Sequence, residues 1–283
     1  MKSSKELMAD KESLVTKINE AVQYIKSKTT RQPQIGIVLG TGLGPLAEQL
    51  EEVTSIPYGD IPHFPTPTIA GHSGRLLIGE LGGQCIAAMQ GRVHYYEGYD
   101  TAEITFPVRV LDRLGIKTII LTNACGAVSK HFAPGDLMVI EDHLSFFCPS
   151  PLRGGNLDEF GERFVDMSAA YTPELVKLAE NTAKELGQKL QKGVYGYWHG
   201  PTFETAAEIR GFMALGADVV GMSTVPEAIV ARHCGLNTLG ISCITNMTCI
   251  YGTDGTNHED VIEVGNQVSE KFIALIKGIV EKI

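Results

Sequence analysis

The sequence contains no long apolar run. No stretch approaches the roughly 18 consecutive apolar residues that are needed to span a bilayer. The first twenty residues, MKSSKELMADKESLVTKINE, also lack the continuous apolar core of a secretory signal. We therefore expect a cytoplasmic protein without a membrane partner.

Positive charge is also scarce. The chain has a formal net charge of -9 over 283 residues, of which 20% are charged and 43% apolar. Because phosphate backbones attract basic surfaces, this balance argues against nucleic acid as a partner. A small anionic substrate is not excluded, since a local cationic pocket can lie on an acidic surface.

Metal-binding patterns are missing as well. The six cysteines form no C-x-x-C pair, and the eight histidines form neither H-E-x-x-H nor a carboxylate-rich cluster. We expect no metal site, and reduced, largely buried thiols, as is usual in the cytosol. The cysteines are Cys85, Cys125, Cys148, Cys234, Cys243 and Cys249.

Helices and strands are predicted to alternate along the chain. Apolar spacing of three and four residues predicts a helix within the first thirty residues, and compact apolar runs that end in glycine predict buried strands. This order favours one α/β domain over 1–283, with a central mixed, largely parallel sheet flanked by helices. We predict strands at 35–40, 75–81, 84–91, 117–126, 137–143, 193–199, 218–222 and 237–246, helices at 101–114 (interrupted near Pro107), 172–188, 204–216, 225–235 and 259–282, and a long loop at 144–170.

Small or polar residues follow four of the predicted strands, in GTGLG, TNACG, GMST and ITN. In open α/β folds, ligands bind at the carboxyl ends of the strands. We therefore expect these four strand ends to converge on one site.

The loop GTGLG (40–44) resembles two cofactor motifs without matching either. Pro45 stands where the dinucleotide fingerprint needs its third glycine, and no Walker Gly-Lys-Ser/Thr occurs in the chain. The backbone N–H groups of such a turn can approach a small anion, and Thr41 adds a hydroxyl donor. A structural turn and an anion-binding loop both stay open.

The segment GRVHYYEGY (91–99) also follows a strand. In extended geometry Arg92 and His94 point to the same side, where a guanidinium and an imidazole N–H suit a phosphate dianion. A surface arginine and a structural histidine are the alternative. The clustered tyrosines and glycines favour a loop that faces a ligand.

The segment GPTFET (200–205) precedes a predicted helix. Thr202 can cap that helix, which would place Glu204 in its first turn. Alternatively, Glu204 accepts hydrogen bonds from a heterocycle on which Phe203 stacks.

Three further polar residues have a capping or turn interpretation beside a functional one. Ser223 can cap the helix that follows it, and Asn246 can hold a turn at the end of its strand. His258 can cap the last helix. The chain contains no nucleophile elbow around a serine, which argues against a covalent hydrolase.

Taken together, these segments resemble the trimeric, 6-oxopurine-specific purine nucleoside phosphorylases. The match is compound and runs over nearly the whole chain. The matching motifs are, in order, GTGLG, PTIAGHSGRL, GRVHYYEGY, TFPVRV, TNACG, PLRGGN, GPTFET, GADVVGMSTVPEAIVARHCGL, ITN and NHEDV.

The resemblance implies a role for each residue at a matching position. The implied phosphate contacts are Thr41, Arg92, His94, the backbone N–H of Ala124 and Ser223, with His72 in the loop that covers the phosphate. The implied nucleoside contacts are Tyr96 and Met222 at the ribose, His258 at the 5′-hydroxyl, Phe203, Glu204 and Asn246 at the base, and Phe160 from the neighbouring subunit of a homotrimer. Asn246, Glu204, His94 and His258 would carry the catalysis.

The implied reaction is the reversible phosphorolysis of inosine- and guanosine-type nucleosides and deoxynucleosides to free base and (deoxy)ribose 1-phosphate, with phosphate as co-substrate and no cofactor. Asn246 can donate to purine N7, which stabilises the departing base. Glu204 can accept the N1–H of a 6-oxopurine, and adenine has no such proton, so the site can discriminate by on the order of 10⁴.

Two alternatives remain beside this function. The first is a methylthioadenosine phosphorylase, against which Asn246 in place of an aspartate and His258 argue. The second is a non-catalytic nucleoside-binding or storage protein of the same fold, since fold does not guarantee activity. The chain departs from the family at Thr41, where serine is usual, at Cys125, and at Trp198 and His199.

Overall fold

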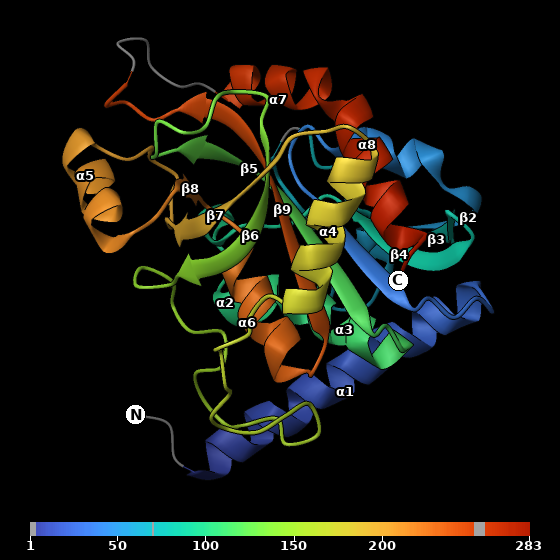
Figure 1. Ribbon diagram of the computed structural model, residues 1–283. Helices are drawn as coiled ribbons and strands as arrows, with labels where there is room; N and C mark the ends of the chain where they lie inside the picture. The colour runs from blue at the N-terminus through green and yellow to red at the C-terminus, as the bar shows by residue number, and fades with distance from the viewer. Residues whose placement is uncertain (1–3, 70, 252–257) are drawn as a thin grey trace.

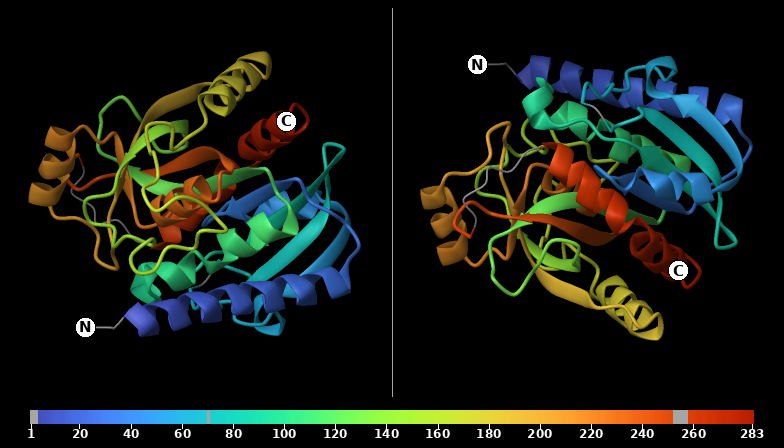
Figure 2. Two further views of the ribbon diagram at one scale, coloured as in Figure 1. Left: turned by 90° about the horizontal axis from the view of Figure 1, so that it is seen from below. Right: turned by 90° about the horizontal axis from the view of Figure 1, so that it is seen from above.

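The computed structural model describes residues 4–69, 71–251 and 258–283, apart from the side chains of residues 4–9 and 258. Within these ranges the strands form one mixed sheet, and helices pack on both of its faces (Figure 1 and Figure 2). The strands are β1 (Ile35–Leu39), β2 (Glu51–Pro57), β3 (Arg75–Leu81), β4 (Gln84–Gln90), β5 (Thr118–Ala127), β6 (Leu137–Leu144), β7 (Leu190–Tyr197), β8 (Val219–Gly221) and β9 (Asn237–Met247). The helices are α1 (Ser4–Lys28), α2 (Thr101–Ile104), α3 (Phe106–Leu114), α4 (Pro173–Glu185), α5 (Ala206–Leu215), α6 (Val225–His233), α7 (His258–Gln267) and α8 (Ser269–Val280), with 3-10 turns η1 (Gly44–Gln49), η2 (Tyr58–Asp60) and η3 (Tyr95–Glu97).

The sheet is buried on both faces, as the side chains of β1 illustrate. Successive side chains of a strand point to opposite faces. Ile35 and Ile37 join the core that contains Phe272 of α8, whereas Val38 joins the core that contains Ile18 of α1 and Val110 of α3. Burial on both faces explains why this strand is an unbroken apolar run in the sequence.

The strand order places the strand ends together. It is β2-β3-β4-β1-β5-β8-β7-β6-β9, and β9 also pairs with β5, so the last five strands close into a ring. Within the described ranges, five pairings are parallel and four antiparallel. The parallel neighbours β4, β1, β5 and β9 therefore end at the same edge, where the loops that follow them meet.

The predicted elements are confirmed with two exceptions. The strand β2 was not predicted, because five of its seven residues are neither buried nor strongly apolar, and it is held mainly by antiparallel pairing with β3. The last predicted helix is divided at Val268 into α7 and α8. The interruption near Pro107 is confirmed, since α2 ends at Ile104 and α3 begins at Phe106.

The six cysteines are unpaired in the structure. The expectation of largely buried thiols is wrong in part, because only Cys125 and Cys243 are buried and Cys249 is exposed. Among the described residues, no helix is both long and apolar enough to cross a membrane.

Candidate active site

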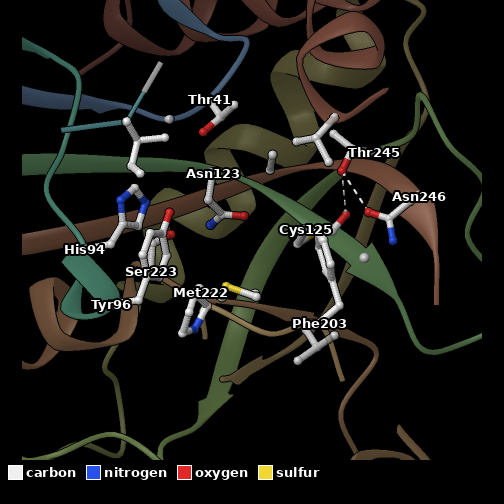
Figure 3. A pocket seen from close by; sticks show the side chains of 18 of the residues that line it. Thr41, His94, Tyr96, Asn123, Cys125, Phe203, Met222, Ser223, Thr245 and Asn246 are labelled. Carbon is white, nitrogen blue, oxygen red and sulfur yellow. Dashed lines mark hydrogen bonds between the residues drawn. The ribbon is translucent and has the colours of Figure 1, made fainter. Parts of the chain in front are cut away.

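A cavity of about 380 Å³ opens where the strand ends meet. Figure 3 shows His94, Tyr96 and Ser223 on one side of it and Phe203, Thr245 and Asn246 on the other, with Met222 between them. The expected convergence of the strand ends is therefore observed. The cavity is lined by ten of the residues singled out in the sequence, namely Thr41, Arg92, His94, Tyr96, Ala124, Phe203, Glu204, Met222, Ser223 and Asn246.

Arg92 is the buried cation of this cavity. Its side chain is 3% exposed, its Nη1 donates to Ser223 Oγ at 2.8 Å, and its Nη2 lies 3.2 Å from Glu227 Oε2. Its Nε and Nη2 make no hydrogen bond within the described part of the chain. Because a buried charge is costly unless its donors are satisfied, this guanidinium favours an anion beside it.

The turn before α6 holds Ser223 beside Arg92. Thr224 has φ +72°, which is unfavourable for a β-branched residue. Its Oγ1 accepts from Asn123 Nδ2 at 3.0 Å and from Arg92 Nη1 at 3.3 Å, and these bonds hold the strained turn. Such local strain is typical of a ligand site rather than of an ordinary helix start. The simple capping interpretation of Ser223 is wrong, because its hydroxyl accepts from Arg92 instead.

The GTGLG loop is both a structural turn and a cavity wall. Gly42 has φ +75°, and a Cβ there would lie 2.9 Å from Gly265 Cα, so the turn requires glycine. Thr41 Oγ1 lies 3.2 Å from His72 Nε2, and His72 Nδ1 accepts the backbone N–H of Arg92 at 3.2 Å. In a neutral ring the proton is therefore on Nε2, which donates to Thr41. The hydroxyl proton of Thr41 can then be donated to an anion in the cavity.

The protonation of His94 follows from its partner Glu97. Burial disfavours the charge on Glu97, but hydrogen bonds from His94 and Thr68 outweigh it and lower the pKa of this carboxyl to about 2. An ionised carboxylate only accepts, so Nδ1 of His94, at 2.9 Å from Glu97 Oε1, carries the proton. Burial also lowers the pKa of His94, which keeps the ring neutral. The neutral ring of His94 therefore carries its lone pair on Nε2, the nitrogen that does not contact Glu97.

Tyr96 and Met222 form the middle of the cavity. The Tyr96 ring stacks on His94 with centroids 4.8 Å apart, and burial raises the pKa of its hydroxyl to about 12, so that it stays a donor. Gly200 packs against both residues. It has φ +65°, and a Cβ there would lie 2.5 Å from Met222 Sδ and 2.9 Å from Tyr96.

Glu204 and Phe203 stand on the loop between β7 and α5. The cap of α5 is Thr205, whose Oγ1 accepts from Glu208 N at 3.3 Å, so the prediction that Thr202 caps this helix is wrong. Glu204 lies before the helix and lines the cavity. Burial raises the pKa of its carboxyl to about 7. The Phe203 side chain is 47% exposed at the rim.

Asn246 enters the cavity through a bulge in β9. Cys125 pairs with Ile244 and Gly126 with Asn246, so Thr245 is an extra residue in β9. A bulge of this kind re-aims side chains, and both Thr245 and Asn246 line the cavity. The Thr245 hydroxyl lies 3.1 Å from Asn246 Oδ1 and 3.3 Å from the carbonyl of Cys125 (Figure 3). Donation to Oδ1 fixes Nδ2 as the donating end of the amide, and Nδ2 donates to the carbonyl oxygen of Met247 at 3.3 Å.

Sequence reasoning missed two polar residues of the cavity, Asn123 and Thr245. Asn123 is 1% exposed, and its Oδ1 has no hydrogen-bond partner in the described structure. Thr245 orients Asn246. Both residues stand inside motifs that the sequence did mark, TNACG and ITN, so their polar character after a buried strand was the available signal.

Two residues named from the sequence, His72 and Phe160, are not among the described residues that line the cavity. His72 lies behind Thr41 and touches it. The side chain of His258 lies outside the described part of the chain, although Val261, one turn further along α7, lines the cavity. Phe160 is 6% exposed and packs under Arg109 and Arg113 of its own chain, with ring centroids 5.2 and 4.4 Å from their guanidinium carbons.

Within the single chain the ring of Phe160 is largely enclosed. The expectation that Phe160 extends into a neighbouring subunit's site stays a prediction. The described residues also contain no group of histidine, cysteine and carboxylate side chains that is arranged to hold a metal ion.

Comparison with known proteins identifies a family and several similar proteins. A family model described as the phosphorylase superfamily matches residues 34–281. The chain is 48% identical over 268 residues to purine nucleoside phosphorylase 1 of Geobacillus stearothermophilus, covering 95% of this chain and 98% of the relative. It is 45% identical over 267 residues to the purine nucleoside phosphorylase of Bos taurus, covering 91% and 92%. A solved structure of the Schistosoma mansoni purine nucleoside phosphorylase in complex with inosine matches with a TM-score of 0.90 and 36% identity, over 95% of this chain and 97% of that one.

Proposed function

Since the chain belongs to the phosphorylase superfamily and, within it, to the purine nucleoside phosphorylases, we propose that its cavity binds phosphate and a 6-oxopurine nucleoside side by side and transfers the ribose between them. One observation carries this proposal. One cavity is lined both by a group rich in donors around Arg92 and by the carboxyl of Glu204 and the amide of Asn246. Figure 3 shows His94 and Ser223 on the side opposite Phe203 and Asn246.

Phosphate occupies the end of the cavity near Arg92. The guanidinium, the hydroxyls of Thr41 and Ser223 and the backbone N–H of Ala124 are the donors there. His72 supports Thr41 from behind. The Thr41 hydroxyl serves as serine would, and its methyl group leaves the donor in place.

His94 is the hydrogen-bond acceptor for the proton of monohydrogen phosphate. Its Nδ1 proton is bound to Glu97, so its Nε2 accepts rather than donates while the ring is neutral. Monohydrogen phosphate brings a proton that can be shared with this nitrogen. Sharing that proton increases negative charge on the phosphate oxygens beside the ribose, where positive charge develops in the transition state.

The ribose lies between the two ends, against Tyr96 and Met222. Gly200 allows the loop of residues 198–205 to pack against both of these side chains and so to close this part of the cavity. We propose that His258 binds the 5′-hydroxyl from the start of α7.

The base occupies the end with Phe203, Glu204 and Asn246. Cleavage of the bond between C1′ and N9 leaves negative charge on the purine, which Asn246 Nδ2 stabilises by donating to N7. Ionised Glu204 accepts the N1–H of a 6-oxopurine. An adenine ring would instead set two acceptors against each other, and this mismatch supports inosine and guanosine as substrates.

Incubation of the protein with inosine, in the presence and in the absence of phosphate, tests this function. We expect hypoxanthine and ribose 1-phosphate only in the reaction that contains phosphate. Release of hypoxanthine without phosphate would indicate a hydrolase. No release in either reaction, together with binding of inosine by calorimetry, would indicate the non-catalytic binding protein. Faster cleavage of methylthioadenosine than of inosine would indicate the related 6-aminopurine enzyme.

A further inference from the structure

Trp198 is the only tryptophan of the sequence, and it stands directly after β7. Its ring is 8% exposed and belongs to a core cluster with Ile209 and Phe212 of α5. The centroid of its ring lies 6.3 Å from that of Phe212 and 5.5 Å from that of Phe147, which belongs to the long loop. The indole therefore joins β7, α5 and the long loop beside the base end of the cavity.

The indole N–H of Trp198 is used within the same loop. Nε1 donates to the carbonyl oxygen of Thr202 at 2.9 Å. Phe203 and Glu204, the two base-end residues of this loop, follow Thr202 directly. A hydrogen bond to this carbonyl therefore fixes the backbone from which both side chains leave.

Neighbouring contacts hold the two ends of the loop. At one end Gly200 packs against Met222 and Tyr96, and at the other end the cap of α5 fixes Thr205. The thiol of Cys249 lies 3.5 Å from the carbonyl oxygen of Glu204. The indole N–H binds the backbone at Thr202, between Gly200 and Thr205.

We propose that Trp198 is a positioning residue for the base, whose indole N–H sets the path of residues 202–204 and thereby the placement of Phe203 and Glu204. This proposal rests on the proposed function, because it assigns the purine to these two side chains. Trp198 is one of the positions at which the chain departs from the family. On this proposal the tryptophan contributes to nucleoside binding as well as to the core.

The single tryptophan allows the N–H to be removed alone. Expression without tryptophan but with 3-benzothienylalanine replaces the indole N–H by sulfur at position 198 and nowhere else, since the chain holds one tryptophan. We expect the KM for inosine to rise about 2- to 10-fold, as for loss of one hydrogen bond, and the KM for phosphate to stay unchanged. Parallel rises in both KM values, or an unchanged KM for inosine, would overturn the proposal.

Two further measurements separate positioning from packing and from the proposed function. Hydrogen exchange of the amides of residues 202–206 should become faster in the analogue, whether or not the protein cleaves nucleosides. Phe212→Leu loosens the same cluster and keeps the N–H, so it should lower the melting temperature while leaving these amides as protected as in the parent protein. Equal hydrogen-exchange rates of these amides in the analogue and in the parent protein would also overturn the proposal. If the parent protein did not carry out phosphorolysis, only the proposed function would be overturned.

Discussion

Glu204 is a carboxyl group whose surroundings favour its neutral form. Burial raises its pKa from 4.5 to about 7, whereas acceptance of a purine N1–H requires the ionised form. Its contribution to the free energy of unfolding therefore falls as pH rises from 4.5 through about 7, because the folded state holds the proton more tightly than the unfolded state. Stability and substrate binding thus have opposite pH dependences at this residue.

The affinity for inosine should consequently fall on the acid side of neutrality. We expect the KM for inosine to rise as pH drops below about 7, at saturating phosphate, because protonated Glu204 no longer accepts the N1–H. Measurement of the KM between pH 5.5 and 8.5, a range of roughly three units around that pKa, tests this. Glu204→Gln removes the titrating group at nearly constant shape. The same acid limb in this variant would show that another group causes it.

Asn246 is the residue on which the departure of the base depends. We expect Asn246→Ala to lower kcat for inosine by on the order of 10²–10³, as for loss of a donor to the transition state. Asn237→Ala is a matched control, since Asn237 is an exposed asparagine at the other end of β9. Unchanged turnover in a folded Asn246→Ala protein would remove the role that we assign to this amide.

Among the elements, α5 begins immediately after the base-end residues. Thr205 accepts from Glu208 N, and the Glu208 carboxylate accepts from Thr205 N at 2.7 Å, which is a reciprocal cap. The first turn of this helix therefore fixes the end of the loop that carries Glu204. A local capping bond in this way contributes to the geometry of the site.

Removal of this cap should affect both stability and binding. We expect Thr205→Ala to lower the free energy of unfolding by about 0.5–2 kcal/mol and to raise the KM for inosine, because the start of α5 frays next to Glu204. Urea unfolding and steady-state kinetics measure the two effects. Thr205→Ser keeps the hydroxyl and should resemble the parent protein. A loss of stability with an unchanged KM would show that the cap does not position the loop.

For the whole molecule, the question is its assembly. Phe146 and Phe164 of the long loop are 70% and 89% exposed in the single chain. We propose a homotrimer, which the resemblance to trimeric enzymes supports.

Light scattering should give a mass close to three times 30.6 kDa. Phe164→Ser should shift dissociation of the assembly to higher protein concentration, because it removes an exposed apolar contact. Glu162→Ser, which alters an exposed residue two positions away, should leave the mass unchanged. A parent protein with the mass of a single chain would contradict the trimer.

The sequence by itself determined the order of the elements and most of the site. Runs such as IGIVLG and KTIILTNACG predict buried strands because burial on both faces demands unbroken apolar residues, and polar residues after such runs mark the ligand edge. Ten of the residues that line the cavity were found in this way and through the ordered motifs. That all strands of the described ranges form one sheet also supports the prediction of a single domain over 1–283.

The tertiary structure decided what depends on contacts between segments that are distant in the chain. Closure of the ring by β5 and β9, the weakly apolar strand β2 and the burial of Phe160 under Arg109 and Arg113 are all long-range pairings. The pKa of Glu204 follows from burial, and the proton on His94 Nδ1 from a carboxylate that Thr68 also helps to keep ionised. Local periodicity carries no information about such partners, because a side chain's protonation and exposure are set by neighbours that only folding brings near.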